Sequence, residues 1–281
     1  MSATELMKYA ALFVLNKASD VKNIFLIFSL LSPFFAEALQ VSDFSVVEKL
    51  KPGEKKQVSL TLFNDRDTEE QVNLSLVDYG CNSEGQHFFG DLPEKAMRSN
   101  ISWVHLGQDR VKLAPQERRA IYYVIEVPKD SSLKGSYWSV LLIEPTEILN
   151  AENLEKGQFK VNVKIRYAHH IVTNIGEGTT ALKLFKKEIK EIEGKRYLCI
   201  HVLNEGDQFF VPSLTLKLYD RKGVLKKTLE TQTERLYPGN PQSFLVDIGD
   251  LTEDELRNEL SGFVLFDAKG DHVFGDRFTY P

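Results

Sequence analysis

The sequence predicts an all-β protein: two tandem immunoglobulin-like β-sandwich domains after an N-terminal signal segment. Three observations predict this fold class, namely short runs of alternating apolar and polar residues, turn residues between those runs, and a repetition of the pattern in the second half of the chain. Alternation with a period of two is the mark of a strand that buries one face. Several short strands with regular turns are typical of β-sandwiches, and 281 residues suffice for two such domains.

The N-terminal segment, residues 1–38, has the features of an export signal. Lys22 precedes an apolar stretch, residues 24–35, which has the length of a signal-peptide core and is short for crossing a bilayer. Ala36 and Ala38 then place small residues at the two positions that a signal peptidase reads. We therefore expect cleavage after Ala38, and an uncleaved membrane anchor is the alternative interpretation.

The first 20 residues fit poorly in front of this signal, because a signal peptide normally begins near its positive region. We expect translation to start at Val21, which makes residues 1–20 an upstream extension. After cleavage, the mature chain is expected to begin at Leu39.

The first domain, residues 39–172, shows the strand pattern most clearly. Apolar residues alternate with serine, threonine or asparagine in the runs 58–62 and 72–76, and further apolar-rich runs cover residues 121–127, 137–143 and 161–167. Turn residues separate most of these runs, as in the Lys-Pro-Gly sequence that precedes the first of them. This punctuation predicts strands joined by tight turns.

A repeat locates the second domain, residues 179–281. Sliding the sequence on itself by 140 residues places Asn64 on Asn204 and the leucines of the run 72–76 on Leu214 and Leu216, and the apolar residues of the run 58–62 fall on apolar residues. A second similarity relates Leu113-Ala114-Pro115 to Leu236-Tyr237-Pro238. Repetition at this scale predicts two folding units of one kind rather than a solenoid, whose periods are far shorter.

The boundary between the two domains is expected in residues 173–178, which are rich in glycine and lack a strand pattern. Near the C-terminus, Thr252 and Glu255 match a capping box, which predicts one short helical turn there. Cys81 and Cys199 fall in different domains, and we expect two separate buried thiols because free cysteine behaves as a small hydrophobe.

Several segments of the first domain resemble one known group of proteins. They are Leu50–Glu54 before a strand, Trp103-Val104, Val111–Glu117, Ile125–Pro128 and Gly135–Trp138. In this order they resemble the periplasmic immunoglobulin-like domains of the PapD-like superfamily, which holds the pilus-assembly chaperones and related two-domain envelope proteins of bacteria. The resemblance covers the first domain well and the second weakly. It implies an exported, non-catalytic protein, periplasmic or secreted, that binds a client by β-strand addition.

The resemblance also implies where the client binds, namely the strand Lys160–Ala168. The residues with expected roles are Val161, Val163, Ile165 and Tyr167 on one face and Lys164 and Arg166 on the other. Lys164 is implied as the anchor for a client's terminal carboxylate, although the family's partner arginine has no match in residues 39–47. The residues alone also fit an ordinary solvated strand face, because lysines commonly guard sheet edges.

A second hypothesis is a structural or adhesive module that binds an envelope partner through loops. The loop of residues 81–99 carries Phe88, Phe89 and Met97 among charged residues, and long loops in compact domains are often functional. An enzyme is not expected, because the chain has no nucleophile elbow, phosphate loop or zinc-protease motif.

The composition narrows the class of partner. The formal net charge is −5 with both signs interspersed, so no basic field attracts nucleic acid. The expected partner is another envelope or secreted protein, with membrane contact only through the signal segment before cleavage. His169 and His170 are neighbours on an expected strand and point to opposite faces, so they cannot chelate one metal ion. We expect no metal and no cofactor.

Overall fold

The computed structural model describes residues 39–82, 86–92, 98–146, 149–150, 162–163, 165–220, 222–231, 234–249, 251, 261–267 and 273–279. The chain divides into two compact units, Met1–Ala38 and Leu39–Pro281, and every described residue belongs to the second. The expected signal segment with Ala36 and Ala38, and the expected helical turn at Thr252, lie outside the described residues.

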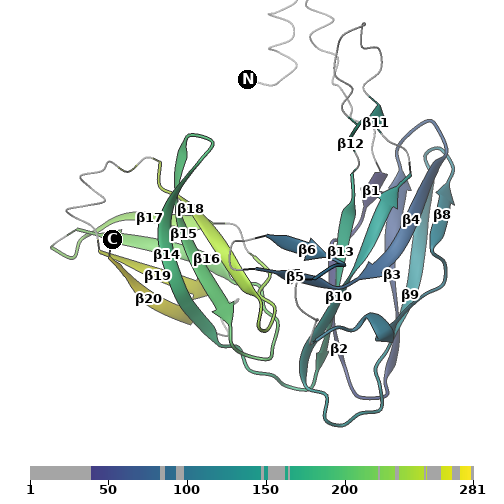
Figure 1. Ribbon diagram of the computed structural model, residues 1–281, viewed down its shortest axis with the longest axis horizontal. Coiled ribbons are helices and arrows are strands. Elements are labelled where there is room, and N and C mark those ends of the chain that lie inside the picture. The colour runs from purple at the N-terminus through teal and green to yellow at the C-terminus, as the bar shows by residue number, and fades with distance from the viewer. Residues whose placement is uncertain are drawn as a thin grey trace, which may run out of the picture. The chain divides into compact units, whose positions relative to one another are not determined.

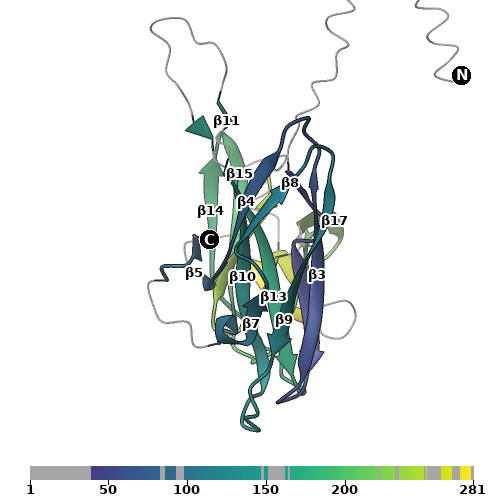
Figure 2. The same ribbon diagram turned by 90° about the vertical axis from the view of Figure 1, so that its right-hand side faces the viewer.

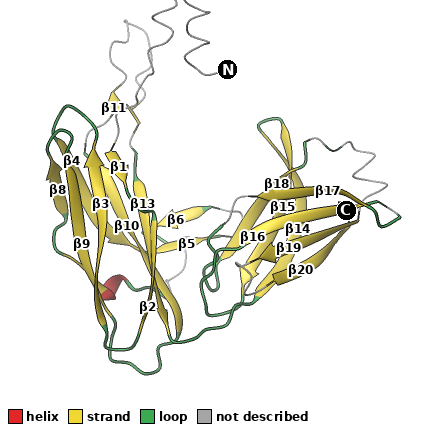
Figure 3. Ribbon diagram, turned by 180° about the vertical axis from the view of Figure 1, so that it is seen from behind, coloured by secondary structure: helices red, strands yellow, loops and turns green. Residues whose placement is uncertain are grey.

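The described residues form strands almost throughout, with one helical exception, the 3-10 turn η1 (Ile101–Trp103), drawn in red in Figure 3. None of the helical structure in this described part is long and apolar enough to cross a membrane. The prediction of an all-β fold is therefore confirmed.

The first half of the described chain forms two sheets (Figure 1). Sheet 1 has the order β1 (Leu39–Val41), β3 (Lys55–Asn64), β9 (Arg118–Glu126) and β7 (Val104–Leu106). Sheet 2 has the order β2 (Ser45–Leu50), β13 (Tyr167–Ile175), β10 (Gly135–Pro145), β4 (Glu70–Val77) and β8 (Arg110–Leu113). Two short ladders accompany them, β5 (Tyr79–Cys81) with β6 (His87–Phe89), and β11 (Leu149–Asn150) with β12 (Asn162–Val163).

The second half forms two further sheets. Sheet 3 has the order β14 (Leu182–Ile192), β15 (Lys195–Asn204) and β18 (Pro241–Asp247). Sheet 4 has the order β17 (Leu225–Thr231), β16 (Ser213–Tyr219), β19 (Ser261–Asp267) and β20 (Val273–Thr279). The strands β3, β4, β9 and β10 run lengthwise through the first sandwich in Figure 2.

Each half has its own apolar core, built from the inward residues of the alternating runs. Leu62 and Ile125 of sheet 1 meet Val72 and Leu141 of sheet 2, and all four are fully or almost fully buried. The cluster around Phe244 plays the same part between sheets 3 and 4. Each sandwich therefore rests on the burial of its own strand faces, which is the main favourable contribution to folding.

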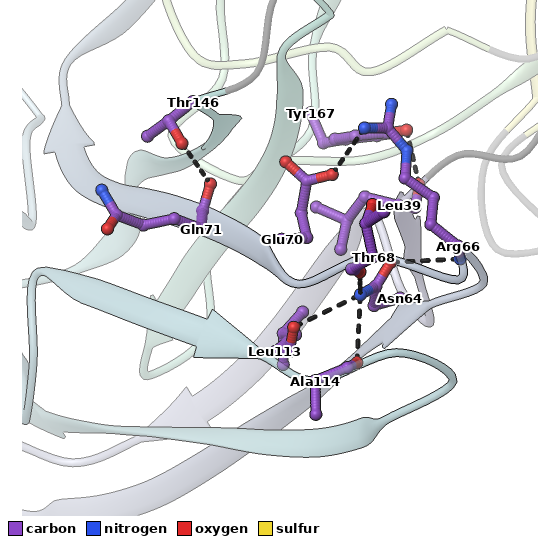
Figure 4. A network of polar contacts seen from close by, with 10 residues as sticks. All are labelled: Leu39, Asn64, Arg66, Thr68, Glu70, Gln71, Leu113, Ala114, Thr146 and Tyr167. Carbon is purple, nitrogen blue, oxygen red and sulfur yellow. Dashed lines mark hydrogen bonds and ion pairs between the residues drawn. The ribbon is translucent and has the colours of Figure 1, made fainter.

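The predicted repeat is visible in atomic detail at Asn64 and Asn204, which end β3 and β15 and are both fully buried. In each, Oδ1 accepts a hydrogen bond from the backbone N–H two residues on, at 3.1 and 3.0 Å. The Asn64 amide nitrogen donates to the carbonyl oxygens of Thr68 and Ala114 (Figure 4), and that of Asn204 donates to those of Gln208 and Leu236. Each sandwich thus has one buried asparagine that closes an equivalent turn.

Because the two asparagines make equivalent hydrogen bonds, replacing either one should lower the stability of the protein by a similar amount. Asn64→Ala and Asn204→Ala should each lower the free energy of unfolding by about 2–3 kcal/mol, because each leaves several buried backbone groups without a partner. Asn73→Ala is the control, since Asn73 is half-buried and its amide oxygen accepts a hydrogen bond from the exposed Arg110 side chain at 3.2 Å. Urea unfolding followed by circular dichroism measures all three variants. Equal losses for Asn73 and Asn64 would contradict the role given to the buried amides.

The expected linker at residues 173–178 is partly a strand, so that expectation is wrong in its first half. Strand β13 continues through Thr173 to Ile175, both buried, and pairs there with Tyr137 and Gly135 of β10. The polar Thr173 hid this continuation in the sequence, because its hydroxyl is satisfied inside the fold by the Asn100 amide at 3.0 Å.

Candidate partner-binding edge

The strand that resemblance marks as client-binding leads into β13, and one side of β13 is only partly paired. Along its whole length β13 pairs antiparallel with β10. On its other side β2 pairs with it in parallel, but only from His170 to Ile175. Residues 167–169 therefore have no strand partner on that side among the described residues.

The start of β13 is unpaired on this side because the chain changes from one sheet to the other between β1 and β2. Strand β1 pairs with β3 in sheet 1, whereas β2, a few residues later, pairs with β13 in sheet 2. Between Val41 and Ser45 the chain crosses from one sheet to the other, so it cannot cover the start of β13. The edge is thus left open by the path of residues 41–45 rather than by the sequence of β13 itself.

Backbone geometry decides which groups face the open side. The N–H of His170 donates to the Phe44 carbonyl at 2.9 Å, so His170 points its backbone towards β2. Successive strand residues point their N–H and C=O groups to opposite sides, so Ala168 and Arg166 share the direction of His170. The Ala168 N–H and C=O therefore face the open edge, where an added strand would find them.

Apolar side chains flank this edge. Ile165 is 39% exposed and Phe44 is 50% exposed. The Phe44 ring stacks on that of Tyr167 with 6.4 Å between ring centroids. A short row of unpaired backbone groups beside such side chains offers both main-chain hydrogen bonds and apolar contact to an extended peptide.

Tyr167 is held by its own domain. Its hydroxyl donates to the Leu39 carbonyl at 2.5 Å, and its ring packs on the first core (Figure 4). Burial raises the pKa of this hydroxyl, so it is a donor at neutral pH. Nearby, the buried Glu70 forms an ion pair with Arg66 at 2.9 Å. The Tyr167 hydroxyl is thus committed to the fold, which fixes the start of β13.

The structure describes some of the other residues predicted to bind a client and not others. Val161 and Lys164 lie outside the described residues, and for Val163 the structure describes only the backbone, which pairs with Leu149 in the β11–β12 ladder. Arg166 is exposed and its guanidinium forms an ion pair with Glu144 at 2.6 Å. The structure therefore brings Ile165, Arg166 and Tyr167 together at the open edge and is silent on the implied anchor Lys164.

The expected divergence of the two histidines is confirmed. The His169 ring lies 3.0 Å from the Tyr123 hydroxyl, inside the first sandwich. The His170 ring lies 2.7 Å from the hydroxyl of Tyr237, a residue of the second half of the chain. Among the residues that the structure describes, no group of three or more metal-ligating side chains is placed to hold an ion.

His170 belongs to a buried cluster that sequence reasoning missed. Trp138, Val172, Phe209 and Tyr237 pack together on the outer face of sheet 2, and the Trp138 indole nitrogen donates to the Tyr79 carbonyl at 2.8 Å. Burial, assisted by the charge of Arg235, lowers the pKa of His170 to about 3. We refer to these residues, with Tyr79 and His170, as the junction cluster.

Glycine 135 makes this packing possible. A Cβ atom at this position would lie 2.2 Å from the Asp207 carbonyl oxygen, and its φ of +74° disfavours any other residue. Next to it, the Ser136 N–H donates to the same carbonyl at 2.7 Å. In the sequence, this close approach to Asp207 is indicated only by a Gly-Ser pair at the start of an expected strand.

Both cysteines are free and buried, as expected. The Cys81 thiol donates to the Pro241 carbonyl at 2.7 Å, and burial raises its pKa to about 12. Burial also raises the pKa of Cys199. Neither thiol has the lowered pKa of a reactive cysteine.

No family model matches this chain, and no curated protein matches it. Solved structures do. The class 5 fimbriae chaperone CfaA is 12% identical over 87% of this chain and 100% of its own, with a TM-score of 0.45. The SafB chaperone of Salmonella enterica, solved with the SafA pilin, is 11% identical over 86% of this chain and 96% of its own, with a TM-score of 0.42. The E. coli chaperone DraB is 12% identical over 86% of this chain and 98% of its own, with a TM-score of 0.41. All three of these structural neighbours are chaperones by name, at low sequence identity to this chain.

Proposed function

We propose that this chain is a non-catalytic binding protein of the bacterial envelope, a PapD-like chaperone or assembly factor in the periplasm or outside the cell. It binds an extended segment of another envelope or secreted protein by β-strand addition at the start of β13. The observation that carries the proposal is the open edge at residues 167–169, where the Ala168 backbone faces outward.

Three features of this edge support the proposal. The opposite side of β13 is fully paired with β10, so an added strand would join a supported ladder. The exposed Ile165 and Phe44 side chains offer apolar contact beside the backbone groups. Arg166 is engaged with Glu144, so the edge lacks the free lysines that commonly guard exposed strands, among the residues described here.

Two variants test the edge. Ala168→Pro removes an N–H that points to the open side and none that bonds β10, so edge geometry tolerates it. Ile165→Asp places a charge beside the added strand. Val224→Asp is the matched control, because Val224 is an exposed aliphatic residue in the second sandwich. Each protein, checked for folding by circular dichroism, is used as bait in envelope extract, with recovered partners quantified by mass spectrometry.

We expect one partner to fall at least tenfold with both edge variants and to persist with Val224→Asp. Equal recovery of every partner with all three variants would reject strand addition at this edge. In that case the hairpin β5–β6 becomes the better candidate, because Phe89 is 41% exposed on it and the loop module was the second hypothesis. Loss of that same partner with Phe89→Ala alone would then support the structural or adhesive role.

A further inference from the structure

Strand β14 forms an edge of sheet 3 that the proposed function does not use. It pairs with β15 on one side, and among the described residues no strand pairs with it on the other. An uncovered edge presents a row of backbone N–H and C=O groups that can pair with a further strand. The edge can therefore accept another strand, and the side chains of β14 decide which strand that is.

The regular part of β14 is the segment 186–192. Before it, Phe185 is an extra residue in the ladder with β15, because the register shifts between Leu184 and Lys186. A bulge of this kind interrupts regular pairing. After it, the turn Glu193-Gly194, in which both residues have positive φ, ends the strand. An added strand would thus pair with these seven residues.

The two faces of this segment both carry lysine and glutamate. Ile189 packs against the core of the second sandwich, so it lies on the inner face, and Lys187 and Glu191 share that face because strand side chains alternate. Glu188 and Lys190 lie on the outer face, where they form an ion pair at 3.0 Å. Charges of both signs therefore line the edge on either side of Ile189.

A second copy of the same segment matches these charges. Antiparallel pairing centred on Ile189 places Glu188 opposite Lys190 of the second copy and Lys187 opposite Glu191 of the second copy. Because such a pairing has two-fold symmetry, each of these contacts forms twice. Opposite charges directly across antiparallel strands stabilise the pairing. The two Ile189 side chains face each other at the centre.

Neighbouring registers lose this match. Moving the centre by one or two residues in either direction places a lysine or a glutamate opposite its own copy, and like charges across strands are destabilising. Lysines on an edge commonly prevent pairing with other strands. In β14 they oppose most partners and register shifts, and they favour one partner in one register.

The same register also covers two exposed apolar side chains. Phe185 is 44% exposed and Ile192 is 38% exposed. The Phe185 ring lies 6.0 Å from the ring of His201, and Ile192 lines the same surface concavity as His201, so both side chains lie on the outer face. With the centre at Ile189, Ile192 lies opposite Lys186 of the second copy, next to its Phe185. Each end of the pairing therefore gains an apolar contact.

We propose that two copies of this chain associate through β14, in the antiparallel register centred on Ile189, so that sheet 3 continues from one copy into the other. Pairing of one strand from each copy makes an interface smaller than that of permanent dimers, so we expect a Kd on the order of 10–100 μM. The site is independent of the β13 edge, so the two proposals stand or fall separately.

Charge reversal on the inner face tests the register. Lys187→Glu and Glu191→Lys each place like charges opposite each other and should weaken the dimer at least tenfold. In an equimolar mixture, a glutamate of one variant meets a lysine of the other at both positions, so the mixed dimer should form within threefold of the native affinity. Both changes leave the contact of Glu188 with the buried His201 intact. Sedimentation equilibrium at concentrations on both sides of the expected Kd measures each protein, after circular dichroism confirms its fold.

Two controls locate the interface. Lys183→Glu reverses an exposed charge on the same strand outside the segment 186–192 and should change the affinity less than twofold. Ala168→Pro alters the β13 edge and should leave the dimer unchanged, whereas loss of the dimer with this variant would assign the association to β13 and reject the proposal. The proposal is also overturned if the native protein stays monomeric, if either inner-face variant dimerises as the native protein does, or if mixing the two fails to restore association.

Discussion

Trp138→Ala should lower the free energy of unfolding by about 3–5 kcal/mol, the loss expected for removing a large buried aromatic. Trp138 is 5% exposed, and its ring lies 4.8 Å from that of Tyr237. It also holds the Tyr79 carbonyl through its indole N–H. The alanine variant therefore loses apolar burial, a hydrogen bond and the packing that joins residues from both halves of the chain.

Urea unfolding measures this loss, with Tyr122→Ala as the control. Tyr122 is an aromatic residue that is 54% exposed on β9, so its removal should change the free energy of unfolding by less than about 0.5 kcal/mol. Trp138→Phe should fall between the two, because it keeps a ring but loses the indole N–H. A cost below about 1 kcal/mol for Trp138→Ala would mean that the junction cluster is not packed in solution.

Acid should destabilise the protein through His170. An unfolded histidine has a pKa of about 6.5, whereas burial lowers the pKa of folded His170 to about 3. As the pH falls below 6.5, the unfolded chain takes up a proton that the folded chain refuses, so stability is lost between these two values. From pH 7 to pH 4.5 this one group should lower the free energy of unfolding by about 2–3 kcal/mol.

The measurement compares how the free energy of unfolding changes with pH in two proteins. Urea unfolding at several pH values is performed on the native sequence and on His170→Gln, which cannot take up the proton. The difference between the two curves should shrink by the stated amount on acidification, whatever the carboxylates do in both proteins. His169 contributes in the same direction, since burial also lowers its pKa, but it is present in both proteins. Parallel curves would show that His170 is not buried as described.

The sequence predicts much of this fold because its signals are local. The alternation of apolar and polar residues along a strand involves neighbouring residues only. The equivalence of Asn64 and Asn204 can be predicted because each asparagine closes a turn within a few residues. The divergence of His169 and His170 follows from the period of a strand alone. Such features need no knowledge of distant contacts, and the structure confirms them.

What the sequence does not predict depends on partners far away in the chain. The open edge of β13 arises because the chain changes sheets between Val41 and Ser45, and the sequence of β13 itself does not indicate this change. The junction cluster pairs His170 with Tyr237, whose types are ordinary for a sandwich core. The close approach of Gly135 to Asp207 is equally invisible, because a glycine before a strand usually marks a turn.

The contact between the first and last strands of the first sandwich has a kinetic consequence. The hydrogen bond from Tyr167 to Leu39 joins residues 128 positions apart, and the parallel ladder of β2 and β13 spans a similar separation. Contacts of this kind form late, because the loop entropy must be lost before they contribute. A chain that emerges from its N-terminus must therefore leave β2 and the outer edge of β10 unpaired until β13 has been delivered. These unpaired strand edges are exposed to aggregation during that interval, and the speed of delivery, more than final stability, should limit the yield of folded protein.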